Sequence, residues 1–146
     1  MDRGTELLVD RARPGGRVAV TIWQRGAMAT PGQALVAAVA AERGSPVPTP
    51  AASSALQAVQ QPDAFASWLG ARGLVDVEVT TAVHQLPSTA EALWLLVLGS
   101  GFRGLLRDLD DDAVGRVRAG YLAALEGGAP VDATTLVGLG RRPAAG

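Results

Sequence analysis

The sequence contains no cysteine and no lysine, so all 13 of its basic residues are arginine. Without cysteine, the chain can form neither a disulfide nor a thiolate metal site. His84 is its one histidine, and only 4% of its residues are aromatic. The formal net charge of −1 argues against a basic surface that would bind nucleic acid.

Long apolar runs are missing as well. No run reaches the length that crosses a bilayer, and the N-terminus has no apolar stretch of the kind found in secretory signal peptides. We therefore expect a cytoplasmic protein with no membrane partner and no nucleic-acid partner. Hydrophobic residues nevertheless make up 48% of the 146 residues, which suffices for one ordinary domain with its own core.

Residues 12–23 are the stretch around which the rest of the chain is organised. They predict the end of a helix, a tight turn and a strand. Pro14 cannot continue a helix, and Gly15 and Gly16 accept positive φ angles. Residues 18–23 are largely apolar on both faces, which is typical of a strand that is covered on two sides in an α/β sheet.

Capping and turn residues mark several helices. Thr30 followed by Pro31 predicts a helix start, and Gly44 predicts the end of that helix. The prolines of residues 45–54 predict an extended connector. Pro62 begins the next helix. The expected packing residues are Leu7, Leu8 and Ala12 in the helix that ends at residue 12, and Phe65, Trp68 and Leu69 in the helix that begins at Pro62.

Two more strands are expected. Residues 74–84 alternate between an apolar and a polar face, which is typical of a strand at a sheet edge. Residues 133–141 are apolar on both faces, so we expect this last strand to be more central. Gly138 and Gly140 weaken it but allow a close approach of another segment. The apolar face of residues 74–84 consists of Val75, Val77, Val79, Thr81 and Val83.

Residues 88–126 predict helices without strands. Ser88 to Glu91 matches a capping box, and glycines at 99 and 101 interrupt the helix that follows it. Asp110 to Asp112 suit the positive end of a last helix that runs to Glu126. A solvated N-cap cluster explains these aspartates better than a cation site, because the spaced oxygens of a calcium loop are missing.

A resemblance to a known family rests on these same residues. The order of helix, Arg-Pro-Gly-Gly-Arg, apolar strand and Trp23 resembles the C-terminal half of class I S-adenosylmethionine-dependent methyltransferases. The similarity is closest to the small-molecule branch related to ubiquinone and menaquinone biosynthesis. Residues 62–83 resemble the family's sixth strand with its preceding helix, and the terminal Leu-Val-Gly-Leu-Gly-Arg-Arg resembles its seventh strand.

The resemblance implies an α/β fold, a partial Rossmann-like methyltransferase fold. Its sheet would be a three-stranded mixed sheet in the family order 5-7-6, with the last strand in the middle. Residues 88–126 would form a helical insertion or lid before that last strand. Residues 1–146 would then form a single truncated methyltransferase-like domain.

The chain departs from the family at the cofactor site. The family binds its cofactor with a Gly-rich loop after the first strand, and this sequence has no such loop after an N-terminal strand. The family's first four strands would lie upstream of Met1. S-adenosylmethionine is therefore the cofactor by resemblance only, and we expect no cofactor-binding, catalytic or metal-binding residue in this chain and no tight cofactor binding by it.

Residues 18–22 would then form an exposed apolar edge where the family's fourth strand belongs. Such an edge favours pairing with another chain, so we expect a homo-oligomer that forms through Val18 to Ile22.

Six residues are candidates for a pocket that binds the methyl acceptor, and four of them have an alternative structural explanation. Trp23 and Met28 follow the organising stretch, but Trp23 could equally cover the core or the sheet edge. Helix packing explains Trp94 and Phe102 more simply. His84 is the one candidate general base, although a partly exposed position at a strand end explains it better. The six candidates are Trp23, Met28, His84, Trp94, Phe102 and Arg103.

Three functions follow from these patterns, and the third and weakest is a small homodimeric enzyme that uses a pocket in residues 88–126. The first is the C-terminal portion of a methyltransferase that acts on a small molecule and is completed by another segment. The second is a non-catalytic α/β module, derived from that fold and dimeric, that binds a ligand or another protein. The sequence does not identify the methyl acceptor.

Overall fold

The computed structural model describes residues 2–48 and 56–144. These residues form two compact units. The sheet unit comprises residues 2–25, 56–84 and 134–144, and the helical unit comprises residues 26–48 and 85–133. Most of the connector expected over residues 45–54 lies outside the described residues, and residues 46–48 have no regular structure.

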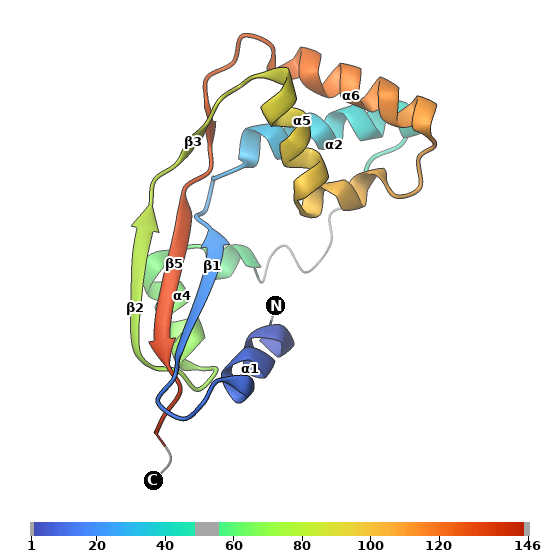
Figure 1. The fold of residues 1–146 in the computed structure, drawn as a ribbon. Coiled ribbons are helices and arrows are strands. Elements are labelled where there is room, and N and C mark those ends of the chain that lie inside the picture. Colours follow the sequence, from blue (N-terminus) through green and yellow to red (C-terminus); the bar gives the residue numbers. More distant parts are fainter. Residues whose placement is uncertain (1, 49–55, 145–146) are drawn as a thin grey trace. The chain divides into compact units, whose positions relative to one another are not determined.

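The sheet unit contains three strands, β1 (Arg17–Trp23), β2 (Val75–Ala82) and β5 (Thr135–Arg141). The order along the sheet is β1-β5-β2, so the last strand lies at the centre, as its apolar pattern predicts (Figure 1). Both pairs are antiparallel. The α/β class is thus confirmed, but the sheet is not mixed, because β5 separates the two strands that run in the same direction.

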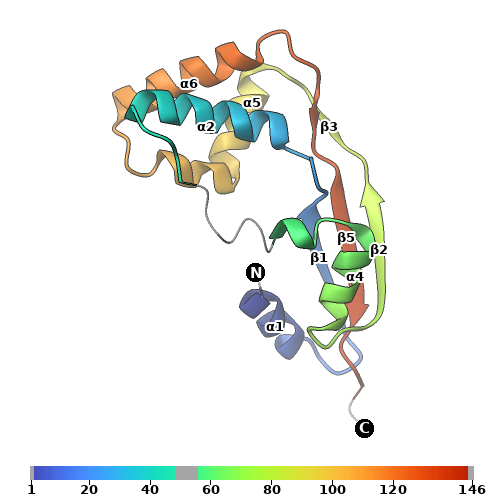
Figure 2. The same cartoon turned by 180° about the vertical axis from the view of Figure 1, so that it is seen from behind.

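Two helices, α1 (Asp2–Arg11) and α4 (Pro62–Gly70), pack on one face of this sheet. Figure 2 shows α4 in front of the strands. Fully burying one large apolar side chain stabilises a fold by about 1.5–3 kcal/mol, so the core makes a large contribution. The buried core residues are Val9, Val18, Ile22, Phe65, Leu69, Leu74 and Leu136.

The other face of β1 is open. Ala19 and Thr21 are exposed, so the prediction of a strand covered on two sides is wrong for the residues that the structure describes. Ala19 and Thr21 have small side chains, so their exposure leaves little apolar surface in contact with water. Sequence alternation alone does not distinguish a covered small residue from an exposed one.

Three predicted packing residues are more exposed than expected. Leu7 and Leu8 are 51% and 56% exposed, because α1 turns Thr5 and Val9 toward the sheet instead. Trp68 is half-buried rather than core. Its ring stacks against Phe65 with the ring centroids 6.0 Å apart, and the Arg72 guanidinium lies 4.0 Å from the centroid of the Trp68 ring.

Strand β2 is an edge strand with one wet face, as predicted, but it ends at Ala82 rather than His84. A bulge between Val75 and Glu78 shifts its register, and Asp76 has a φ of 51° there. The bulge interrupts the two-residue alternation, so only Val77 and Val79 of the predicted apolar face pack on the core. The other three members, Val75, Thr81 and Val83, are exposed.

The turn from α1 to β1 is held to the end of β5. Gly15 has a φ of 71°, and the Gly16 amide donates to the Arg13 carbonyl at 2.8 Å. Arg142 donates from its backbone amide to Gly16 at 2.8 Å and from its guanidinium to Ala12 at 2.7 Å. Arg142 thereby satisfies a carbonyl just after the C-terminus of α1 and one in the turn that follows it.

The helical unit contains α2 (Ala29–Arg43), α5 (Ala90–Gly99), the 3-10 helix η1 (Gly101–Leu106) and α6 (Asp111–Leu125). A short strand pair, β3 (Gln85–Leu86) with β4 (Val131–Asp132), was not predicted. The most fully buried side chains of this unit come from α2, α5 and α6: Pro31, Leu35, Val39, Val97, Val117 and Tyr121.

Two of the predicted helix ends are confirmed and two are wrong. Asp110 caps α6 by accepting from the Ala113 amide at 2.8 Å, and Gly44 ends α2 in the left-handed region. The residue that caps α5 is Thr89, not Ser88, because Ser88 donates to the distant Ala129 carbonyl instead. Helix α2 begins one residue earlier than Thr30, after Met28.

Gly138 allows the close contact between α4 and β5 that the sequence predicts. A methyl group at this position would overlap the Leu69 side chain and lie 2.9 Å from Phe65 Cε1.

We expect Gly138→Ala to lower the free energy of unfolding by about 1–3 kcal/mol. The matched control is Gly115→Ala in α6, where a methyl group meets no atom within 4 Å. This control should stabilise the protein by about 0.5–1 kcal/mol. Urea unfolding measures both changes, and equal effects of the two variants would contradict the packing argument.

Candidate functional site

A cavity of about 180 Å³ lies in the helical unit beside the N-terminus of α2. Its inner wall is apolar and buried, and exposed or half-buried residues form its rim. The inner wall consists of Met28, Pro31, Leu93, Leu125 and Val131. The rim includes Ala29, Thr30, Ser88, Gly128, Ala129, Pro130 and Asp132.

Met28 adopts an unusual backbone conformation at this wall. Its φ of 61° and ψ of 9° are in the left-handed region, although it is not glycine, and its side chain is only 5% exposed. Such a conformation costs on the order of 1 kcal/mol and persists where the surroundings hold it. The Met28 amide donates to the Asp132 carbonyl at 2.9 Å, and its own carbonyl accepts from Gly32 at 3.0 Å.

The loop that forms the opposite rim is also held in place. Gly127 has a φ of 68°, and the Gly128 amide donates to the Leu125 carbonyl at 3.1 Å. The Ser88 hydroxyl donates to the Ala129 carbonyl at 2.6 Å. Because the loop then enters β4, which pairs with β3, both sides of the cavity are fixed by hydrogen bonds.

This lining favours binding over acid–base chemistry. Asp132 is the only titratable side chain among the lining residues, and it is exposed. Across the described parts of the chain, no group of three or more His, Asp or Glu side chains is arranged to hold a metal ion. The cavity can therefore hold and orient an apolar molecule, but its walls supply no buried general base.

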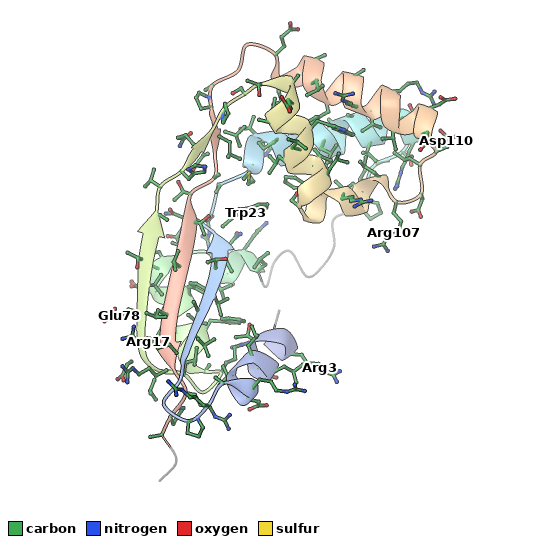
Figure 3. The ribbon with its side chains drawn as sticks, in the orientation of Figure 1. Arg3, Arg17, Trp23, Glu78, Arg107 and Asp110 are labelled. Atoms are coloured by element: carbon green, nitrogen blue, oxygen red, sulfur yellow. The ribbon has the colours of Figure 1, made fainter. Side chains whose placement is uncertain are left out.

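The six candidate residues occupy different places. Met28 lines the cavity, whereas Trp94 packs on Tyr121 with ring centroids 6.3 Å apart. Phe102 lies against Gly32, where a methyl group would be 3.2 Å from Phe102 Cζ. Arg103 is exposed and lines a separate open groove with Leu98 and Arg107. In that groove Arg107 projects outward from the helical unit (Figure 3).

The other two candidates belong to the sheet unit. Trp23 is half-buried at the end of β1 (Figure 3), where it lines a shallow groove with Leu56 and Gln60. His84 is exposed and lies beyond the end of β2. The structure thus brings Met28 alone of the six to the cavity.

Sequence reasoning missed the rest of the lining. The sequence pattern gives these residues only local roles: Pro31 marks a helix start, Leu93 and Leu125 are apolar residues of the helices predicted over residues 88–126, and Gly127-Gly128 follows the last of these helices. The succession Gly-Gly-Ala-Pro at residues 127–130 was the available signal, because it has few side-chain atoms with which to fill the space beside it.

Electrostatic effects in the helical unit are modest. The Arg116 guanidinium donates to both carboxylate oxygens of Glu42, at 2.7 and 3.0 Å, and these hydrogen bonds lower the pKa of Glu42. Tyr121 is fully buried, and burial raises the pKa of its phenol. Its hydroxyl donates to the Leu93 carbonyl at 3.3 Å, so Tyr121 ties α6 to the helix that contributes Leu93 to the cavity wall.

No family model and no curated protein matches the chain. Across residues 2–48 and 56–144, no helix combines the length and the apolar character needed to cross a membrane. Function must therefore be inferred from the fold and from the cavity.

Tyr121 is the only tyrosine, and the chain has neither lysine nor cysteine, so this residue dominates titration between about pH 9 and 12. Because its pKa is raised in the folded protein, stability should be unaffected below the ordinary value of 10.0 and should fall as the pH rises through the folded-state pKa. Tyr121→Phe should remove this decline. Urea unfolding at a series of pH values measures it, and an equal decline in the variant would contradict the assignment.

Proposed function

We propose that the chain is the C-terminal portion of a small-molecule methyltransferase that depends on S-adenosylmethionine. The observation that carries this proposal is the place of β5. It lies between β1 and β2 and is antiparallel to both, which makes β1 and β2 parallel to each other. Under the resemblance, β1, β2 and β5 correspond to the family's fifth, sixth and seventh strands.

The two edges of the sheet differ in a way that supports the proposal. Natural proteins protect true edge strands with charges and bulges. Strand β2 has both, because it carries Asp76 and Glu78 and is bulged at Asp76. Glu78 lies on the side of the sheet away from β1 (Figure 3). Residues 18–23 of β1 contain no charge, no proline and no positive φ. The edge of β1 therefore suits a further strand.

The helices indicate where a preceding strand would lie. The connection from β1 to the parallel strand β2 includes α4, which packs on the same face as α1. Crossover connections between parallel strands have the same hand, so successive crossovers on one face advance in one direction across the sheet. A parallel strand that leads into α1 would therefore pair with the free edge of β1, which is the position of the family's fourth strand.

The glycine pairs at 99 and 101 and at 138 and 140 do not fit the family's cofactor-binding loop. Gly99 and Gly101 form the junction of α5 and η1, and Gly138 and Gly140 are covered by Phe65 and Leu74. None of these glycines lies in a loop between a strand and a helix N-terminus that could bind an anionic cofactor group. In the proposed enzyme another segment supplies the cofactor, and this chain holds and positions the acceptor, which can account for much of a transfer rate.

A second candidate function is a non-catalytic ligand-binding module derived from the same fold. The cavity favours it, because residues of the helical unit alone form all of the lining. Such a module would need no cofactor and no upstream segment.

The two functions differ in what precedes the chain in the genome. The methyltransferase proposal expects an open reading frame that continues upstream of codon 1 and encodes a strand followed by a Gly-rich loop. Sequencing of the flanking DNA tests this. An in-frame stop codon next to a ribosome-binding site would instead favour the ligand-binding module.

In the isolated 146-residue chain, we expect the free edge of β1 to pair with a second copy. Thr21 and Thr80 both lie opposite Val137, on β1 and β2 respectively, and both are exposed. Thr21→Lys should weaken the dimer, because it places like charges close together across a two-fold interface. The matched control, Thr80→Lys, should leave it intact.

Light scattering over a range of protein concentrations measures both variants. A wild-type chain that stays monomeric at high concentration, or a dimer that is weakened only by Thr80→Lys, would refute pairing through β1.

A further inference from the structure

We propose that the cavity in the helical unit binds one neutral aromatic ring that carries a hydrogen-bond donor. The inference rests on the geometry of the cavity alone. It goes beyond the methyltransferase proposal and would stand if that proposal failed, because binding requires neither a cofactor nor an upstream segment.

The size of the cavity sets the size of the ligand. Protein interiors pack as densely as organic crystals, and voids larger than a water molecule are few. The cavity has a volume of about 180 Å³ and opens at its rim, so it has room for a small molecule. An apolar cavity of about 150 Å³ engineered into another protein holds one benzene molecule. The volume here suits one ring with a small substituent.

The inner wall sets the polarity of the ligand. Pro31, Leu93 and Leu125 present buried apolar surface, and Met28 adds a polarisable thioether that favours contact with an aromatic ring. No arginine lines the cavity, and its one acid, Asp132, is at the rim. An anionic ligand would lose its hydration without gaining a basic side chain as a partner, which favours a neutral ligand over one attracted only to the N-terminus of α2.

Ser88 sets the hydrogen-bonding group. Its hydroxyl proton is donated to the Ala129 carbonyl, which leaves the lone pairs of the oxygen at the rim as acceptors. A ligand that enters between α5 and the 127–130 loop can donate an O–H or N–H group to this oxygen. Because Met28 and the loop are already held by backbone hydrogen bonds, little ordering is needed on binding.

Phenol, toluene and benzoate are suitable probes, because they share the ring and differ in donor and charge. The chain contains only two methionines, Met1 and Met28, so NMR spectra with 13C-labelled methionine methyl groups give two signals. We expect phenol to shift the Met28 signal in a saturable way while Met1 stays unchanged. Toluene should bind several-fold more weakly than phenol, and benzoate should bind more weakly still.

Ser88→Ala tests the donor directly. It should weaken phenol binding by about 5- to 10-fold, which is the loss of one hydrogen bond of about 1 kcal/mol. Toluene binding should not change in this variant. A change would mean that Ser88 acts by holding the 127–130 loop through Ala129, and not by accepting a hydrogen bond from the ligand. Ser67→Ala, an exposed serine in α4, is the control and should affect neither probe.

Three results would overturn the inference. These are a Met28 signal that no ring compound moves, equal shifts of Met1 and Met28, or benzoate binding as tight as phenol binding. If Ser88→Ala left the affinity for phenol unchanged, the part of the inference that gives the ligand a hydrogen-bond donor would be wrong. None of these outcomes bears on the upstream reading frame, so the failure of this inference and the failure of the methyltransferase proposal are distinguishable.

Discussion

The sheet unit depends on the contact of α4 with β5 at Gly138. Phe65 and Leu69 are fully buried and lie where a side chain at position 138 would have to be. This contact fixes the helix over the central strand, and β1 and β2 then pair with the two sides of β5. At the end of β5, the hydrogen bonds of Arg142 to Gly16 and Ala12 hold the turn that leads into β1. Gly138 of the last strand and Arg142, which follows that strand, thus hold segments from the first half of the chain in place.

A consequence of this arrangement is a sheet with two unlike edges. β2 carries charges and a bulge, whereas residues 18–23 of β1 carry no charge and pair with β5 in an unbroken register. The exposure of Leu7 and Leu8 on α1, the helix that leads into β1, gives the unit further uncovered apolar surface. A larger parallel sheet could cover this edge. The helical unit is different, because its cavity is formed entirely by its own residues and can bind a ligand whatever pairs with β1.

Much of the fold could be predicted from the sequence, since local rules determine it. The Pro-Gly-Gly turn, the Asp110 cap, Gly44 and the central last strand all follow from backbone preference or apolar pattern. Predictions were wrong where distant contacts outweigh those rules. Ser88 bonds to a carbonyl 41 residues away and leaves the capping role to Thr89. A bulge at Asp76 ends the alternation of β2, and backbone bonds hold Met28 in the left-handed region.

The cavity could not be predicted, because three segments far apart in the sequence line it and its defining property is missing volume. Only Met28 of its wall was a candidate.

Our proposal places β1 inside a larger sheet, with β5 antiparallel to it on one side and a parallel strand of the cofactor-binding part on the other. The most direct test is a fused polypeptide, in which the cofactor-binding half of a ubiquinone- or menaquinone-biosynthesis methyltransferase is joined to the residue before α1. Calorimetric titration then measures the dissociation constant for S-adenosylmethionine, and amide hydrogen exchange measures the protection of β1. We expect that fusion strengthens cofactor binding over that of the unjoined half, that this chain alone does not bind the cofactor tightly, and that the β1 amides become protected. Tight binding by this chain alone, or a fusion that changes neither quantity, would contradict our proposal.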